Sequence, residues 1–415
     1  MDLHSFCSDM GFDADTENLL FPCWEKLCAN TAAELPFFMK PEFYRKYYPL
    51  CQGPNGVLER MDEVARITAS DPNCMRYAAM LHYGLYLAVP QMPLQKMPLP
   101  EKKYGDNAGI FQLLAAMSSL PLIAETQKAM GLPESQLAAT AEWLGGTIAI
   151  YAAAHHGIPG HTPQQSAWLR HHIDGKLFRI GRLEYMPGIW DGYMPAVYRS
   201  RKTGALTVLS RDQWMFDSAG LRLPECTEKP AFTSRLKFLD GHVTGTPISP
   251  YGRIQTGRKV SLDLNEWEPL CTDWDPVLHI HIPGGGGMSV SAVRESLLAA
   301  RQFFRKYFST DVKVFCCASW ILNPVWEKEL PDSNLAALQR NVYMTPAFRS
   351  ENCGLFFVYG QDCDPRTQPR TSRLHEAFCR IYDRNEPLCA GCMFIPASDL
   401  EHFGTEYYRR TYDIR

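Results

Sequence analysis

The sequence predicts an α+β chain, or a mixed α/β chain, with an all-α N-terminal domain (residues 1–165) before a mixed-sheet domain (residues 166–415). Three observations support this prediction. A chain of 415 residues is longer than one hydrophobic core usually supports, so two domains are expected. Apolar residues recur at helical spacing in the first part. After about residue 177, short β-rich runs appear, and these later alternate with helices.

The first part is predicted to be helical from its periodicity and its helix breakers. Helices are expected over residues 57–67, 75–85, 107–130 (with a break or kink at Pro121) and 134–154. The segment 91–100 (QMPLQKMPLP) cannot continue a helix, so it is predicted to be a connector. We find no catalytic pattern in this part, and we expect it to pack on or cover the second domain.

The second part begins with strands and ends in alternating strands and helices. Strands are expected at 177–180, 196–200, 205–210, 232–239 and 259–264, with Lys202-Thr203-Gly204 as a hairpin turn. The expected order after Asp275 is strand 277–282, loop 284–288, helix 289–308, strand 313–322, helical segments up to Tyr343, strand 355–359, helix 372–384 and strand 391–395.

Composition and charge disfavour several functional classes. The 42 basic and 45 acidic residues give a net charge of −3 and form no basic cluster that would suit nucleic acid or an anionic membrane. The N-terminus lacks the basic flank and apolar run of a signal peptide, and the apolar window 137–154 is typical of a buried helix. Fourteen cysteines without such a signal indicate reduced thiols. We therefore predict a soluble, cytoplasmic protein, and we leave its oligomeric state open.

A run of four glycines joins a predicted strand to a predicted helix. Glycines let backbone N–H groups converge, and a helix start adds about half a positive charge beside them. Both features favour a phosphate or pyrophosphate, although a flexible or tightly packed turn is the alternative. Ser289 is expected to cap the helix or to contact the anion. The predicted binding residues are Ile282, Gly284, Gly285, Gly286, Gly287, Met288 and Ser289.

The residues around the glycines disfavour two common phosphate ligands. A dinucleotide site needs a third glycine or an alanine where this chain has Ser289, and an acidic residue after the next strand, which instead ends at Leu322-Asn323. An ATP-binding P-loop needs a lysine at the helix start, which Gly287-Met288-Ser289 lacks. Coenzyme A remains after this elimination.

Four motifs resemble a bacterial family of two-domain acyltransferase-like proteins. They are residues 275–285 (DPVLHIHIPGG), 315–322 (FCCASWIL), 333–335 (SNL) and 176–185 (KLFRIGRLEY). The resemblance implies a helical N-acyltransferase domain followed by a GNAT-like domain that moves an acyl group from acyl-CoA, acetyl-CoA or similar, to a small-molecule amine. The usual GNAT loop carries Arg or Gln, two variable residues, Gly, a variable residue and Gly or Ala. Because this loop differs, it either forms an equivalent site or holds another anion without catalysis.

The implied fold places the thioester between the strands that start at Val277 and Lys313. His279 and His281 lie two apart on one strand and so share a face, and His281 is the first choice as general base. Ser319 is a candidate donor to the acyl carbonyl or sulfur. Tyr343, at the end of the helical stretch, is a candidate acid for the thiolate, with an ordinary packed tyrosine as the alternative.

Metal chemistry is a further alternative. His279 and His281 form a His-x-His pair that a metal-dependent hydrolase could use, and Cys389 and Cys392 have zinc or redox spacing. Further histidines near a probable domain junction could complete the histidine pair, namely His155, His156, His161, His171 and His172, but histidines are common on such mixed surfaces. The cysteine pair has no second pair at the same spacing. We therefore expect no metal. The two cysteines are predicted to be buried strand thiols.

Overall fold

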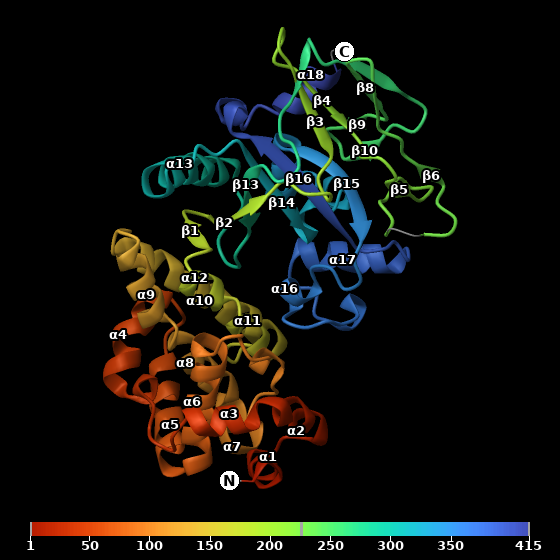
Figure 1. The fold of residues 1–415 in the computed structure, drawn as a ribbon. Coiled ribbons are helices and arrows are strands. Elements are labelled where there is room, and N and C mark those ends of the chain that lie inside the picture. Colours follow the sequence, from red (N-terminus) through yellow and green to blue (C-terminus); the bar gives the residue numbers. More distant parts are fainter. Residues whose placement is uncertain (1, 225–226, 414–415) are drawn as a thin grey trace. The chain divides into compact units, whose positions relative to one another are not determined.

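The structure is a computed structural model that describes residues 2–224 and 227–413 (Figure 1). The chain forms two compact units. The first contains the residues up to Arg179 together with Pro283–Gly285, and the second contains Ile180–Ile282 and the residues from Gly286 onward. The first unit extends beyond the predicted boundary at residue 165, because α11 (Pro163–Ser166) and α12 (Leu169–Ile173) belong to it and Leu169 is part of its core.

The first unit is helical from α1 to α12 (Figure 1), as its periodicity predicts. Its other helices are α1 (Leu3–Met10), α2 (Ala14–Leu20), α3 (Trp24–Asn30), α4 (Pro41–Cys51), α5 (Val57–Ser70), α6 (Pro72–His82), α7 (Glu101–Tyr104), α8 (Ala108–Met117), α9 (Leu120–Ala129) and α10 (Ser135–Ala154). Every residue of α8 is buried, so this helix lies inside the core. Asp71 ends α5 and caps α6 by accepting from the amides of Asn73 and Cys74.

The predicted break near Pro121 is present, and it falls just before the proline. Helix α8 ends at Met117 and α9 begins at Leu120, so Pro121 occupies the first turn of α9, where its missing N–H has no intrahelical partner to lose. The stretch Glu101–Ala129 has the length and hydropathy of a membrane span, but 83% of its most apolar window is buried inside the structure. That degree of burial is also found in core helices.

The second unit is built on a six-stranded sheet with the order β1-β2-β13-β14-β16-β15. The strands are β1 (Phe178–Ile180), β2 (Leu183–Ile189), β13 (Pro276–His281), β14 (Val314–Ser319), β15 (Tyr343–Arg349) and β16 (Cys389–Pro396). Strands β13 and β14 are parallel and are joined by α13 (Val290–Phe308), while β2, β16 and β15 pair antiparallel with their neighbours. The sheet therefore has the mixed character that the sequence predicts.

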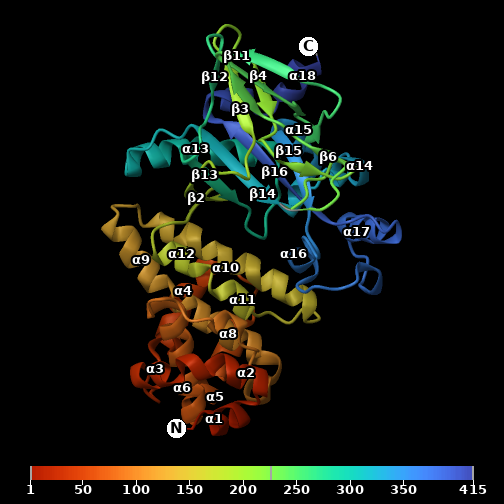
Figure 2. The ribbon, with the colours of Figure 1, turned by 45° about the vertical axis from the view of Figure 1, so that its right-hand side comes forward.

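A β-rich segment lies between β2 and β13 (Figure 2). It contains β3 (Ala196–Ser200), β4 (Leu206–Leu209), β5 (Met215–Phe216), β6 (Phe232–Thr233), β7 (Lys237–Leu239), β8 (His242–Gly245), β9 (Ile248–Ser249), β10 (Arg253–Ile254), β11 (Val260–Asp263) and β12 (Trp267–Pro269). The predicted hairpin at residues 202–204 is confirmed, because β3 and β4 pair antiparallel across it. Two three-stranded sheets, β12-β3-β4 and β11-β8-β7, make up most of this segment.

Two predictions about the last part of the chain are wrong. Residues 355–359 form a short helix, α16 (Leu355–Tyr359), between Gly354 and Gly360, which both have a left-handed backbone suited to helix ends. A five-residue apolar run does not distinguish a strand from a helix by periodicity. The predicted strand 313–322 ends at Ser319 and continues as the 3₁₀ turn Trp320–Leu322, followed by α14 (Val325–Glu329) and α15 (Asn334–Asn341). Helix α17 (Arg373–Asp383) agrees with its prediction.

Buried His161, in the first unit, makes stability depend on pH. Thr147 donates its hydroxyl proton to the Leu144 carbonyl, so its oxygen is left to accept a hydrogen bond from His161 Nδ1 at 2.8 Å. The neutral His161 ring therefore carries its proton on Nδ1. Burial lowers the pKa of His161 from 6.5 to about 3. Between these values the unfolded chain binds a proton that the folded chain does not. The stabilisation is therefore complete above pH 6.5 and is lost as the pH falls.

We expect the free energy of unfolding to fall by about 2 kcal/mol between pH 7 and pH 5 because of His161 alone. Urea unfolding at pH 5, 6 and 7 measures the slope. His161→Gln, which cannot bind a proton, should reduce that slope by the same amount, and His402→Gln, an exchange at a partly exposed site, serves as control. An unchanged slope in His161→Gln would contradict the assignment.

Candidate functional site

The central opening of the second unit lies between β13 and β14. The two strands pair only through Leu278–Phe315 and His279–Cys316. On its other side, β13 pairs with β2 along its whole length, up to His281 opposite Glu184. Beyond His279, the described residues of β13 have no partner in β14. The two strands between which the implied fold places a thioester therefore separate at their C-terminal ends.

The two faces of β13 have different surroundings. Tyr185 lies directly opposite Ile280, and cross-strand neighbours of this kind share a face. The Tyr185 hydroxyl contacts Ser296 Oγ of α13 at 2.8 Å, so α13 covers that face. By strand alternation, His279 and His281 point to the opposite face. Gly188 lies on the same face, and a methyl group at Gly188 would lie 2.2 Å from His279 Cδ2.

The turn after β13 exposes its glycines. Gly285, Gly286 and Gly287 are exposed, whereas Met288 is buried and anchors the turn. Gly285 and Gly286 have φ angles of +75° and +60°, which side-chain-bearing residues rarely adopt. Within the described residues, the amides of these three glycines donate no hydrogen bond to protein. The turn is therefore open to an acceptor from outside.

Arg182 fixes the orientation of the turn. Its Nε donates to the Gly287 carbonyl at 3.1 Å and its Nη2 to the Gly286 carbonyl at 3.4 Å. A trans peptide directs its C=O and N–H to opposite sides. Because the carbonyls face Arg182, the following amides, those of Gly287 and Met288, face away from it. Arg182 also places a positive charge beside the turn, which favours an anion there.

The start of α13 continues this set of amides. Ser289 caps the helix by accepting from the Ala292 amide at 3.3 Å. The structure thus places Ser289 in the first of its two predicted roles. The amides of Val290 and Ser291, at the first turn of a 19-residue helix, have no intrahelical partner. They add the partial positive charge of the helix start to the glycine turn.

The first part of the turn packs closely on α10 within the first unit. A methyl group at Gly146 would lie 2.7 Å from the Gly284 carbonyl oxygen, and Gly285 lies near the Gly146 Cα. On the neighbouring residue, a methyl group at Gly145 would lie 2.1 Å from the Cys51 carbonyl oxygen. Adjacent glycines in α10 therefore allow two backbone segments to approach the helix. Nothing in the local sequence pattern had indicated this role for Gly145 and Gly146.

The comparisons identify the family. The profile of the GNAT-like C-terminal domain family matches residues 177–390, just over half of the 415-residue chain. The protein belongs to this family. The predicted resemblance and the predicted fold class are both confirmed. No curated protein was found to match the sequence.

Solved structures of acyltransferases share the fold over nearly the whole chain. One, in complex with decanoyl-CoA and teicoplanin, has a TM-score of 0.62 at 19% identity and covers 96% of this chain and 100% of its own. A mutant in complex with octanoyl-CoA has a TM-score of 0.61 at 19% identity, covering 95% and 99%. A third, with CoA and 10C-teicoplanin, has a TM-score of 0.59 at 18% identity, covering 96% and 100%. At this identity the likeness concerns the fold alone.

The GNAT-like domain places a carboxylate beside the predicted base. Glu184 is 1% exposed and lies directly opposite His281, on the same face of the sheet. Sequence reasoning missed Glu184, because only the antiparallel register of β2 and β13 brings it there. His279 instead has its Nδ1 3.5 Å from Cys316 Sγ. Burial raises the pKa of the Cys316 thiol well above its usual value, so this cysteine stays protonated.

Ser319 lies at the same sheet end as His281 but on the other face. Ser319 is the last residue of β14, and its Oγ accepts from the Ile321 amide at 3.3 Å to cap the following 3₁₀ turn. Alternation from Cys316, which shares a face with His279, turns Ser319 to the face covered by α13. The structure therefore brings the two candidates to one end of the sheet without directing them to one another.

The structure does not support the predicted acid Tyr343. It is 3% exposed, donates its hydroxyl proton to the Ile248 carbonyl at 2.7 Å and stacks on Phe394. The error arose because α15 ends at Asn341, so Tyr343 begins β15 instead of ending a helix. The alternative, an ordinary packed tyrosine, fits these contacts.

The metal hypothesis finds no ligand set. Among residues 2–224 and 227–413, no group of three or more His, Cys, Asp and Glu side chains could hold a metal ion. His279 contacts Cys316, which lies in the core. Cys389 and Cys392 are buried thiols of β16, as predicted, and three residues apart on a strand they point to opposite faces.

Replacing Tyr343 tests whether its hydroxyl is structural. Tyr343→Phe leaves the buried Ile248 carbonyl without its donor, so we expect the free energy of unfolding to fall by about 1–2 kcal/mol. Chemical denaturation measures this change. Tyr307→Phe, at a partly exposed position on α13, should change stability far less. A neutral effect of Tyr343→Phe would contradict the hydrogen bond.

Proposed function

We propose that this protein is an acyltransferase that moves an acyl group from an acyl-CoA to an amine on a small-molecule acceptor. The observation that carries the proposal is the glycine turn, whose amides face away from Arg182 at the start of α13. This turn follows the strand end where β13 and β14 separate. One anion site and one open strand edge are thus adjacent in the chain.

The turn suits the pyrophosphate of coenzyme A. The amides of Gly287 and Met288 face away from Arg182, and the unpaired amides at the start of α13 follow them directly in the chain, so several donors are available to a phosphate. The open edge of β13 beyond His279 offers backbone groups to an amide-bearing arm such as pantetheine. The acyltransferases that share the fold, solved with decanoyl-CoA, octanoyl-CoA and CoA, support this ligand.

His281 is the proposed general base. As the amine attacks the thioester carbonyl, a C–N bond forms, the C–S bond breaks, and His281 takes the ammonium proton. The resulting imidazolium returns that proton to the departing thiolate, so no separate acid is required. A backbone amide at the open edge of β13 stabilises the negative charge that develops on the carbonyl oxygen. Glu184 holds the His281 ring in orientation.

The acceptor is proposed to be a small-molecule amine, because the solved relative with this fold contains teicoplanin, itself a small molecule. A cytoplasmic location is proposed from the cysteines, since every cysteine that the structure describes is a free thiol. A second candidate function is a non-catalytic CoA- or anion-binding protein. The departure of the glycine turn from the usual GNAT sequence favours it, and turnover of an acyl-CoA would exclude it.

Binding of an acyl-CoA is the direct test. We expect calorimetry to show one site for acetyl-CoA or a longer acyl-CoA. Gly286→Ala strains a φ of +60°, and Gly146→Ala displaces the Gly284 carbonyl. Gly286→Ala should weaken binding by about ten-fold, since about 1–2 kcal/mol separates the strained and relaxed backbones. Gly146→Ala should also weaken binding, because its methyl group would displace the start of the turn. Gly257→Ala, which meets no atom within 4 Å, is the matched control. No binding of any acyl-CoA by the unaltered protein would refute the proposal.

Catalysis by His281 is tested separately from binding. His281→Ala should lower kcat by about 100-fold or more with little change in acyl-CoA affinity, as expected for a general base. Glu184→Gln should lower kcat less. Thiol release from acyl-CoA with a panel of primary amines measures both. His279→Ala is the control, because this residue lies on the same face but contacts Cys316. Equal losses in the two histidine variants would argue against His281 as the base.

A further inference from the structure

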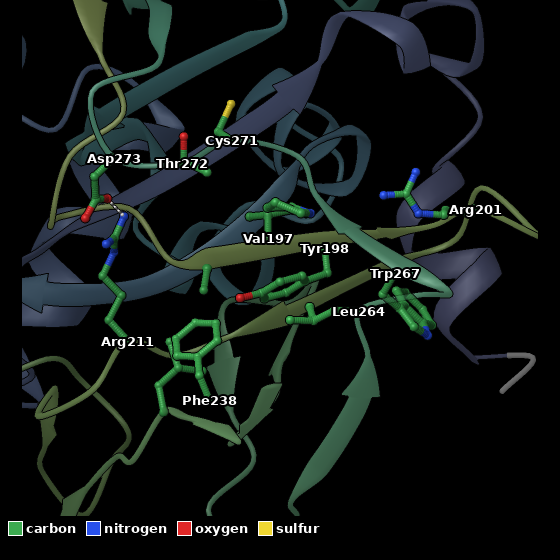
Figure 3. A pocket seen from close by; sticks show the side chains of 13 residues that line it. Val197, Tyr198, Arg201, Arg211, Phe238, Leu264, Trp267, Cys271, Thr272 and Asp273 are labelled. Carbon is green, nitrogen blue, oxygen red and sulfur yellow. Dashed lines mark ion pairs between the residues drawn. The ribbon is translucent and has the colours of Figure 1, made fainter. Parts of the chain in front are cut away.

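The β-rich segment between β2 and β13 contains a pocket that the proposed acyl transfer does not use (Figure 3). Its volume is about 390 Å³, within the range of small-molecule sites. Residues of β3 and β12 form part of the wall, together with the chain that leads into β13. The lining includes Val197, Tyr198, Leu236, Phe238, Leu264 and Trp267. Most of these side chains are apolar, and three are aromatic.

The pocket lies at the other end of β13 from the glycine turn. Cys271, Thr272 and Asp273 line it and precede the start of β13, whereas the turn follows its end. A six-residue strand spans roughly 20 Å. A group bound in the pocket is therefore remote from the proposed reaction centre.

The charged side chains of the pocket neutralise one another. Arg201 pairs with Glu268 at 2.5 Å and Arg211 pairs with Asp273 at 2.5 Å. Arg211 also donates to the carbonyls of Met194 and Asp191. A charged ligand would have to break one of these pairs or remain without a counter-ion. The pocket therefore favours an uncharged ligand.

One hydroxyl supplies a point of polar recognition. Tyr198 is 5% exposed, and within the described part of the chain its hydroxyl makes no hydrogen bond. Figure 3 shows this hydroxyl directed to the side of the pocket where Phe238 and Arg211 lie, with Leu264 beside the ring. Burial raises the pKa of Tyr198, so the group remains a neutral donor at physiological pH. A ligand atom that accepts this hydrogen bond would satisfy it.

Aromatic side chains favour a ring as the apolar part of the ligand. Tyr198 stands between Phe238 and Trp267 in Figure 3, and Phe238 is 64% exposed although it is large and apolar. A planar ring bound there would cover Phe238 and gain ring contacts of about 0.5–1.5 kcal/mol beyond its buried area. We propose that this pocket binds an uncharged aromatic small molecule whose oxygen accepts a hydrogen bond from Tyr198.

Two probes that differ in charge test the proposal on the full-length protein. We expect 2-naphthol to bind with a stoichiometry of one by calorimetry, and 2-naphthoate, with the same ring and a carboxylate, to bind about ten-fold more weakly. Tyr198→Phe should weaken 2-naphthol binding by about five-fold, as expected for one hydrogen bond. Leu264→Trp, which fills the pocket, should abolish it.

Controls separate this proposal from the acyl transfer and from misfolding. Both variants should keep the melting temperature and the acyl-CoA affinity of the unaltered protein, because neither residue belongs to the glycine turn. The proposal is overturned if 2-naphthol does not bind, if Leu264→Trp binds it unchanged, or if 2-naphthoate binds as tightly. It is also overturned if 1-octanol displaces 2-naphthol at lower concentration, which would indicate an aliphatic site. The proposal is likewise overturned if sedimentation shows that 2-naphthol dissociates a dimer, because the pocket would then be a contact site for a second copy of the chain.

Discussion

The site depends on the incomplete pairing of β13. One edge of this strand is fully paired with β2, but the other edge meets β14 at only two positions. Backbone groups left unpaired in a sheet must be satisfied by water or by a ligand, because a buried unpaired group costs about 1–3 kcal/mol. The strand end thus offers hydrogen bonds in a fixed direction. Full pairing of β13 with β14 would add hydrogen bonds to the sheet. It would also remove the strand edge to which the amide groups of a ligand can bind.

The glycine turn shows how one backbone geometry can arise from an unusual sequence. The four glycines provide conformations that side chains disfavour, but flexibility alone would not aim the amides. Arg182 restricts that freedom by binding two carbonyls from outside the turn. A guanidinium supplied by the loop before β2 thus orients peptides that follow β13. Within the first unit, Gly146 of α10 lies close to the Gly284 carbonyl and so restricts the first part of the turn.

Features that depend on residues close together in the sequence were predicted correctly. Features that depend on the register between paired strands were not predicted. The strand–glycine–helix unit, the Ser289 cap and the helices of the first unit follow from local periodicity and capping. Arg182 and Glu184 were missed because antiparallel pairing brings β2 beside β13 across about a hundred residues. Tyr343 was misassigned for a local reason, since the helix α15 ends at Asn341 and the single residue Val342 separates it from β15, so Tyr343 starts a buried strand. The run 355–359 was ambiguous because its flanking glycines, and not its apolar residues, determine the structure.

The placement of Glu184 gives His281 a physical reason to act as a base. A carboxylate with 1% exposure is costly to bury unless charged or polar partners compensate it. His281 lies directly opposite Glu184 on the neighbouring strand, so the two side chains share one face of the sheet. In the proposed reaction, His281 becomes positive as it takes up a proton beside the carboxyl group of Glu184. Because the sheet already holds that group in place, the proposal requires little rearrangement when the imidazolium forms. His279 lacks this neighbour, since the residue opposite it is Met186. The same register that hid Glu184 from sequence reasoning therefore distinguishes the two histidines.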